Sequence, residues 1–189
     1  MMSLPLKKIC YMSLFIAMGV TFGFSLVHIP NIEMMTVTIF ISGYLLGVKE
    51  GLLVGILAEG LFSLLNPLGM AAPPLFVAQT ISMGLTGICG GLLHKISPAK
   101  PITWQHYIGF GFAGALLTLM FAGFTNFGYT LTIGFTWGKF LAGFIAGFPF
   151  IVIHILSNTA IFTLLLPSLL QLTIKHGWFI PNPMQKGNA

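Results

Sequence analysis

Arginine and aspartate are absent from this 189-residue sequence, and three glutamates are its only acids. Charged residues make up 6% of the chain, against about 25% in ordinary soluble domains. The sequence is 56% hydrophobic, with a mean hydropathy of +0.97. A single core in a soluble domain of this length could not bury so many apolar side chains. The composition therefore excludes a soluble domain and predicts an integral membrane protein.

Catalytic signatures are also missing. The sequence has no HExxH, no GxSxG, no P-loop and no paired cysteine cluster, and its scattered acids are too few for a metal-dependent transferase or an intramembrane protease. Cys10 and Cys89 lack metal-ligand spacing, and we interpret both as apolar filler. We expect no enzyme activity, cofactor or metal site; an intramembrane lipid-modifying enzyme is the weakest alternative.

Polar breaks predict one all-α membrane domain over residues 1–189, with six transmembrane helices. The predicted helices cover residues 9–27, 34–48, 51–65, 75–93, 107–127 and 150–173. Lys49 and Glu50 are expected to form the turn between the second and third helices, and residues 66–74 a Pro/Gly-rich loop. The apolar tract at 139–174 is too long for one straight span, so we expect a division at Pro149.

The lysines predict an orientation. With the N-terminus inside, only Lys139 falls in an outer segment, and the inner segments hold Lys7, Lys8, Lys49, Lys95, Lys100, Lys175 and Lys186. Retention of positive charge inside the cell favours this N-in, C-in arrangement. A formal charge of +5 without a longer basic cluster than Lys7–Lys8 does not indicate a nucleic-acid partner.

The second and third predicted helices are shorter than a bilayer core of about 30 Å requires. Short helices leave a recess on the outer side, into which the loops at 28–33 and 66–74 are expected to fold. Non-helical backbone survives at that depth only where protein or a water-filled cavity satisfies it. The sequence therefore predicts an outward-facing pocket capped by loops.

Costly polar side chains gather in the predicted outer half, and such residues are functional candidates by default. The candidate substrate-binding residues are Asn31, Glu33, Glu59, Asn66, Gln79, Asn126, Tyr129, Trp137, Lys139, His154 and Asn158. Amides both donate and accept hydrogen bonds, which suits an uncharged or zwitterionic organic ligand.

Each candidate also has a structural interpretation. Glu59 either contacts a ligand or holds helices together, as a buried carboxylic acid or as a partner of Lys139. His154 and Asn158 share one helix face, and they either bind a ligand or make interhelical hydrogen bonds.

The same choice applies to the predicted outer loops. Tyr129 and Trp137 either stack on a planar ligand or anchor the chain at the membrane interface. Asn31 and Glu33 either face a ligand or cap the helix that begins at about residue 34, because Asn and Glu are ordinary residues at helix N-termini.

Small residues recur every four positions in the first predicted helix, at Ser13, Ala17 and Thr21, with Gly19 and Gly23 on a neighbouring stripe. Small residues let another helix approach closely. The stripe is either an intramolecular packing surface or a docking face for a partner subunit.

Four segments resemble the substrate-binding (S) components of energy-coupling factor (ECF) transporters, which import micronutrients in prokaryotes. They are "SLFIAMGVTFG" (13–23), "IPNIEMMTVTIFISGYLLGVKEGLLVGILAEGLFSLLNPLG" (29–69), "PPLFVAQ" (73–79) and "HILSNTAIFTLLLP" (154–167). "GYLLGVKEGLLVG" looks like the glycine-rich helix–turn–helix that the family has between its second and third spans. The resemblance covers nearly the whole chain and implies a multi-pass protein of the prokaryotic cell membrane.

The resemblance also implies partners: a transmembrane coupling subunit and two ATPase subunits, with no ATPase activity in the S component itself. A vitamin or related micronutrient would bind at the outer face, beneath the first and third outer loops. The Ala-x-x-x-Ala docking signature of the family maps onto Ser13 and Ala17, continued by Thr21. The "IPN.E" and "NP.G...P" pieces look most like S components for cobalamin or for unassigned substrates. Pantothenate, folate and queuosine precursors remain open, and the rival function is a membrane scaffold or assembly protein.

Overall fold

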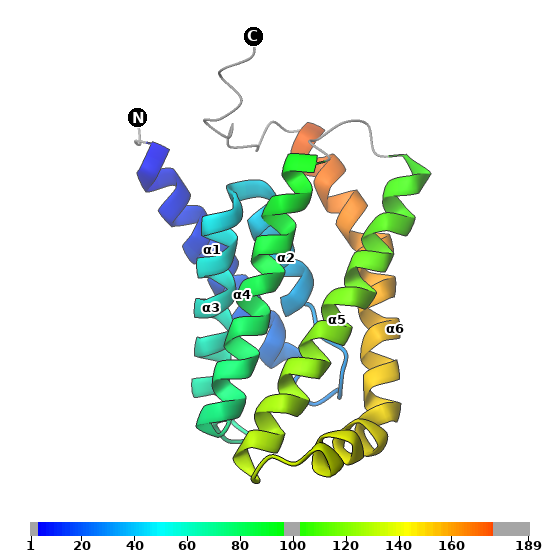
Figure 1. Ribbon diagram of the computed structural model, residues 1–189. Coiled ribbons are helices and arrows are strands. Elements are labelled where there is room, and N and C mark those ends of the chain that lie inside the picture. The colour runs from blue at the N-terminus through cyan, green and yellow to red at the C-terminus, as the bar shows by residue number, and fades with distance from the viewer. Residues whose placement is uncertain (1–3, 97–102, 176–189) are drawn as a thin grey trace.

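The computed structural model describes residues 4–96 and 103–175, and their regular structure is entirely α-helical (Figure 1). The helices are α1 (Leu4–Ser25), α2 (Met35–Leu46), α3 (Val48–Leu64), α4 (Pro73–Ile96), α5 (Trp104–Thr132) and α6 (Trp137–Lys175). The start of α1 and the end of α6 lie at the same end of the bundle (Figure 1). The predicted all-α class and the six helices are confirmed.

Several predicted boundaries are wrong, each for a local reason. Lys49 and Glu50 lie in the first turn of α3 and do not form a turn. Gly47 alone separates α2 from α3, with φ of +120°, a backbone conformation that glycine adopts at little cost. Pro73 and Pro74 begin α4 and do not stay in the loop, because proline is tolerated in the first helical turn. The fifth helix continues to Thr132, beyond its predicted end.

Helix α6 continues through Pro149, where the sequence predicted a division. Helix α6 runs through both Pro149 and Pro167. Figure 1 shows its first part, in yellow, lying across one end of the bundle, and its remainder rising alongside α5. A proline inside a helix removes one backbone hydrogen bond and its ring crowds the preceding turn, which kinks the helix.

Four helices are long and apolar enough to cross a membrane, namely α1, α4, α5 and α6. Helix α2 is a shorter apolar helix of 12 residues, which makes it about 18 Å long at 1.5 Å per residue. These helices support a multi-pass membrane protein.

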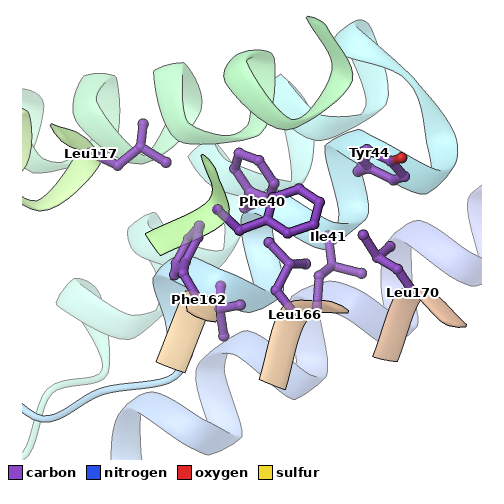
Figure 2. Packing of buried hydrophobic residues seen from close by; sticks show 9 residues of the cluster. Phe40, Ile41, Tyr44, Leu117, Phe162, Leu166 and Leu170 are labelled. Carbon is purple, nitrogen blue, oxygen red and sulfur yellow. The ribbon is translucent and has the colours of Figure 1, made fainter. Parts of the chain in front are cut away.

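The short helix α2 lies at the centre and packs against α1, α3, α4 and α6. Every residue of α2 except Leu45 is buried. On one side, Phe40 meets Phe162 of α6 with ring centroids 5.2 Å apart and an interplanar angle of 66°. Figure 2 shows this pair among the other members of the cluster from α2, α5 and α6. On the other side, Met35 and Ile39 pack with residues of α3 and α4.

Glycines bring α2, α3 and α4 together until backbone touches backbone. A Cβ atom added at Gly43 or Gly51 would collide with the carbonyl group of Gly87, and one added at Gly90 would collide with that of Phe40. Close contact of this kind gives helices van der Waals packing in lipid, where no hydrophobic force draws apolar helices together.

Gly87→Ala tests this contact, because the added methyl group would overlap the backbone of Gly51. Overpacking typically costs about 1–3 kcal/mol, so we expect at least that loss in the free energy of unfolding, measured in detergent. Gly123→Ala, in α5, is the matched control, since nothing lies within 4 Å of its added Cβ. Equal stability of the two variants would contradict the proposed packing.

Candidate functional site

A cavity of about 200 Å³ lies beneath the loop of residues 26–34, where α1 and α3 end and α4 begins. Five candidate side chains meet there from this loop and from α3, α4 and α6: Asn31, Glu33, Glu59, Gln79 and His154. Apolar residues complete the wall, among them Met35, Phe62, Met83 and Phe121. The structure thus brings together a polar set that the sequence could only place on one side of the membrane.

The loop over the cavity is a series of tight turns. The Ile29 N–H donates to the Leu26 carbonyl at 2.8 Å, and the Ile32 N–H donates to the Ile29 carbonyl at 3.3 Å. Asn31 has φ of +61°, in the left-handed region that Asn tolerates better than most residues. Ser157 of α6 donates its hydroxyl to the Asn31 carbonyl at 2.8 Å and so fastens the turn to the bundle.

Glu33 holds the end of this loop with both carboxylate oxygens. Its Oε2 accepts the backbone N–H of Thr36 at 2.8 Å, which satisfies a free donor in the first turn of α2. Its Oε1 accepts from Asn158 Nδ2 at 2.9 Å and lies 3.4 Å from His154 Nε2. One side chain therefore connects the loop, the start of α2 and one face of α6.

These contacts also set the charge state of Glu33. Burial by itself raises the pKa of a carboxyl group. Hydrogen bonds from His154 and Thr36, together with the electrostatic attraction of His154, outweigh burial and hold the pKa of Glu33 below its usual range. The contacts thus favour the ionised form, so the loop is held by a carboxylate.

Glu59 and Gln79 differ from Glu33 because the bundle does not satisfy them. Glu59 is 3% exposed and lines the cavity, and within the described ranges no hydrogen bond or ion pair reaches its carboxyl group. The Gln79 Oε1 atom is buried and has no partner among those residues. The predicted pairing of Glu59 with Lys139 is wrong, because the Lys139 ammonium donates to the carbonyl groups of Ile133 and Gly134 at 2.8 and 2.9 Å.

The other candidates lie away from the cavity. Asn66 accepts the Leu68 N–H at 2.9 Å in its own loop. The sequence predicted that the loop of residues 66–74 folds into the pocket, but none of these residues lines the cavity. Asn126 donates to the Phe140 carbonyl at 2.8 Å and joins α5 to α6. Tyr129 and Trp137 are half or more exposed. The positions of these aromatic residues fit interfacial anchoring.

The structure also changes the predicted role of Asn158 and identifies the residue that caps α2. Asn158 is fully buried and does not line the cavity; its Nδ2 donates to Glu33 and to Thr118 Oγ1, each at 2.9 Å. It therefore supports the loop from behind, as the interhelical alternative predicted. Of the two residues that the sequence offered as caps of α2, Glu33 makes the capping hydrogen bond and Asn31 does not.

Sequence reasoning missed Ser157 and the apolar wall. Ser157 lies between His154 and Asn158, and that neighbourhood is the one signal that would have drawn attention to it. Phe62 and Phe121 carry no such signal, because the chain has 18 phenylalanines and a wall residue looks like any other apolar helix residue.

The two stripes of small residues on α1 differ in burial. Gly19 and Gly23 are buried, and a Cβ added at Gly23 would come within 2.8 Å of Phe62. Ser13, Ala17 and Thr21 are all exposed. Packing within the bundle therefore does not explain the second stripe.

Comparison of this chain with protein-family models, with curated proteins and with solved structures finds no match. In the part of the chain that the structure describes, no group of three or more His, Cys, Asp or Glu side chains is arranged to hold a metal ion.

Asn158→Ala should loosen the loop of residues 26–34, because Glu33 Oε1 would keep only its contact with His154. Loss of a hydrogen bond to a buried charged group costs about 1.5–3 kcal/mol. We expect reduced stability and faster hydrogen exchange of the loop amides. Ser168→Ala is the control on the same helix, since Ser168 is exposed and bonds only to the Leu164 carbonyl. Unchanged loop exchange in Asn158→Ala would contradict the anchoring role.

Lowering the pH should reduce the free energy of unfolding, because Glu33 becomes protonated. Because its pKa in the folded protein lies below the usual range, its contribution to stability is complete above that range and is lost as the pH falls through it and below. Glu33→Gln should remove this part of the pH dependence in detergent unfolding experiments. Glu50→Gln, which alters the Lys8–Glu50 ion pair of 2.6 Å at the other end of the bundle, should retain it. The idea fails if Glu33→Gln titrates like the parent protein.

Proposed function

We propose that this protein is the substrate-specific binding subunit of an ECF-type importer in a prokaryotic cell membrane. One observation carries the proposal: a cavity inside an apolar helix bundle, roofed by an anchored loop, has buried polar groups that the bundle leaves unsatisfied. Unpaired buried polar groups are costly. A bound solute that satisfies Glu59 and Gln79 would account for their presence in the cavity wall.

The topology supports the same function. In the proposal all six helices belong to the membrane domain, with both termini inside the cell. The start of α1 and the end of α6 share one end of the bundle, and the cavity lies where α1 and α3 end. Together with the lysine distribution of the sequence, this arrangement supports an outer position for the cavity. A solute would enter from outside beneath the loop of residues 26–34.

The size of the cavity favours a small micronutrient. The volume of the cavity is about 200 Å³. Cobalamin, with its corrin ring and attached nucleotide, is far larger than this space. A single-ring or two-ring solute is therefore a better substrate for this cavity than cobalamin.

Transport would depend on partners: a coupling subunit and two ATPases that supply the energy. The exposed stripe of Ser13, Ala17 and Thr21 on α1 suits contact with the coupling subunit, since small side chains let another helix approach closely. The alternative function is a membrane scaffold, which the many exposed apolar side chains would also serve. A scaffold has no need for the unsatisfied cavity groups.

Ala17→Leu separates the two functions. In the importer, the larger side chain should block docking, so that the coupling subunit and ATPases no longer copurify with the tagged protein from its own cells, while ligand binding persists. Ala160→Leu is the matched control, because Ala160 is an exposed alanine on α6. Copurifying proteins would be identified by mass spectrometry. The importer is refuted if the unaltered protein brings down no ATPase subunits.

A further inference from the structure

We infer that the cavity selects a small organic cation whose N–H groups donate to Glu59 and Gln79, and that it rejects anionic solutes. The inference rests on the proposed function, because it names the chemical class of solute for that same site. It follows from which cavity groups already have partners, which do not, and which charges are missing from the wall.

Of the two acids in the cavity wall, one is already satisfied. Glu33 accepts hydrogen bonds from Thr36 and Asn158 and lies beside His154. Glu59 comes from α3, is almost completely buried, and has no such partner in the described parts of the chain. An acceptor with no donor in an apolar wall favours a ligand that brings the donor, and a charged donor makes the stronger bond.

Gln79 extends the same pattern from the neighbouring helix α4. Its unpartnered Oε1 is a second buried acceptor, and both Glu59 and Gln79 line the cavity. An amine, amidine or guanidine group carries several N–H donors, so it can meet an acid and an amide oxygen together. The match of two acceptors to one multi-donor group is what indicates a cation.

Among the residues that the structure describes, anions find no arginine or lysine in the wall of this cavity, and its one histidine, His154, already lies beside Glu33. The sequence has no arginine, and no lysine lines the wall; Lys139 is held by two backbone carbonyl groups at the start of α6. A carboxylate or phosphate would instead face Glu33 and Glu59. This argues against acidic micronutrients such as pantothenate and folate, which the sequence left open.

The rest of the wall suits a compact apolar body. Phe62 and Phe121 line the cavity together with Met35 and Met83, and aromatic faces attract cations that approach within about 6 Å. The flexible thioether side chains of methionine adapt to ligand shape. A cationic group on a flat ring therefore fits both the polar and the apolar parts of the wall.

Three probes of equal size and shape test the charge rule: benzamidine, benzamide and benzoate. Each would be added to the purified full-length protein in detergent, and binding measured by thermal stabilisation and calorimetry. We expect benzamidine to bind best and benzoate not to bind. Glu59→Gln should weaken benzamidine binding about 10- to 100-fold, the loss expected for one charge-assisted hydrogen bond. Ser63→Ala, a buried position one turn further along α3 and outside the cavity wall, should leave binding unchanged.

The inference is overturned if benzoate binds as well as benzamidine, if benzamidine does not bind, or if Glu59→Gln binds it like the parent protein. Mass spectrometry of the solute that copurifies from rich medium separates this failure from failure of the importer. An acidic solute together with copurified ATPases would refute the cation and leave the importer standing. Benzamidine binding that requires Glu59, without any ATPase partner, would refute the importer and leave the cation standing.

Discussion

The carboxylate of Glu33 is the contact on which the site depends. It closes the first turn of α2 through Thr36 and ties the preceding loop to α6 through Asn158. Without it, the loop of residues 26–34 would lose its bond to the start of α2 and its carboxylate contacts with α6, and would keep the bond between Ser157 and the Asn31 carbonyl. Because this acid is occupied with structure, Glu59 is the acid of the cavity wall that has no hydrogen bond within the described ranges.

The central position of α2 explains why a cavity exists at all. A helix of 12 residues surrounded by longer ones does not reach both ends of the bundle. The chain that leads into it must therefore descend among the other helices as irregular backbone, where its polar groups need partners. Ser157 and Asn158 supply some of those partners, and the space left beside them is the cavity.

The sequence predicts the helical class, the helix number and the shortness of α2, because hydrophobic runs and proline or glycine breaks act locally. It also identifies the polar residues of the cavity, since such residues are rare in this chain. It could not show that Glu33 and Asn158 hold the loop while Glu59 and Gln79 line the cavity without such partners. Those roles depend on distances between helices far apart in the sequence, and Asn126 and Lys139 looked equally suitable until their backbone partners were known.

The single-residue junction at Gly47 has a consequence for how the chain enters the membrane. Neither α2, with 12 residues, nor α3, with 17 residues and charged groups in its first turn, qualifies as a spanning helix on its own length and composition. In a bilayer each would be a poor insertion signal alone. Joined through Gly47 and packed glycine to glycine, they form a helical hairpin. In the proposed six-helix membrane domain, this hairpin would enter the bilayer as one unit.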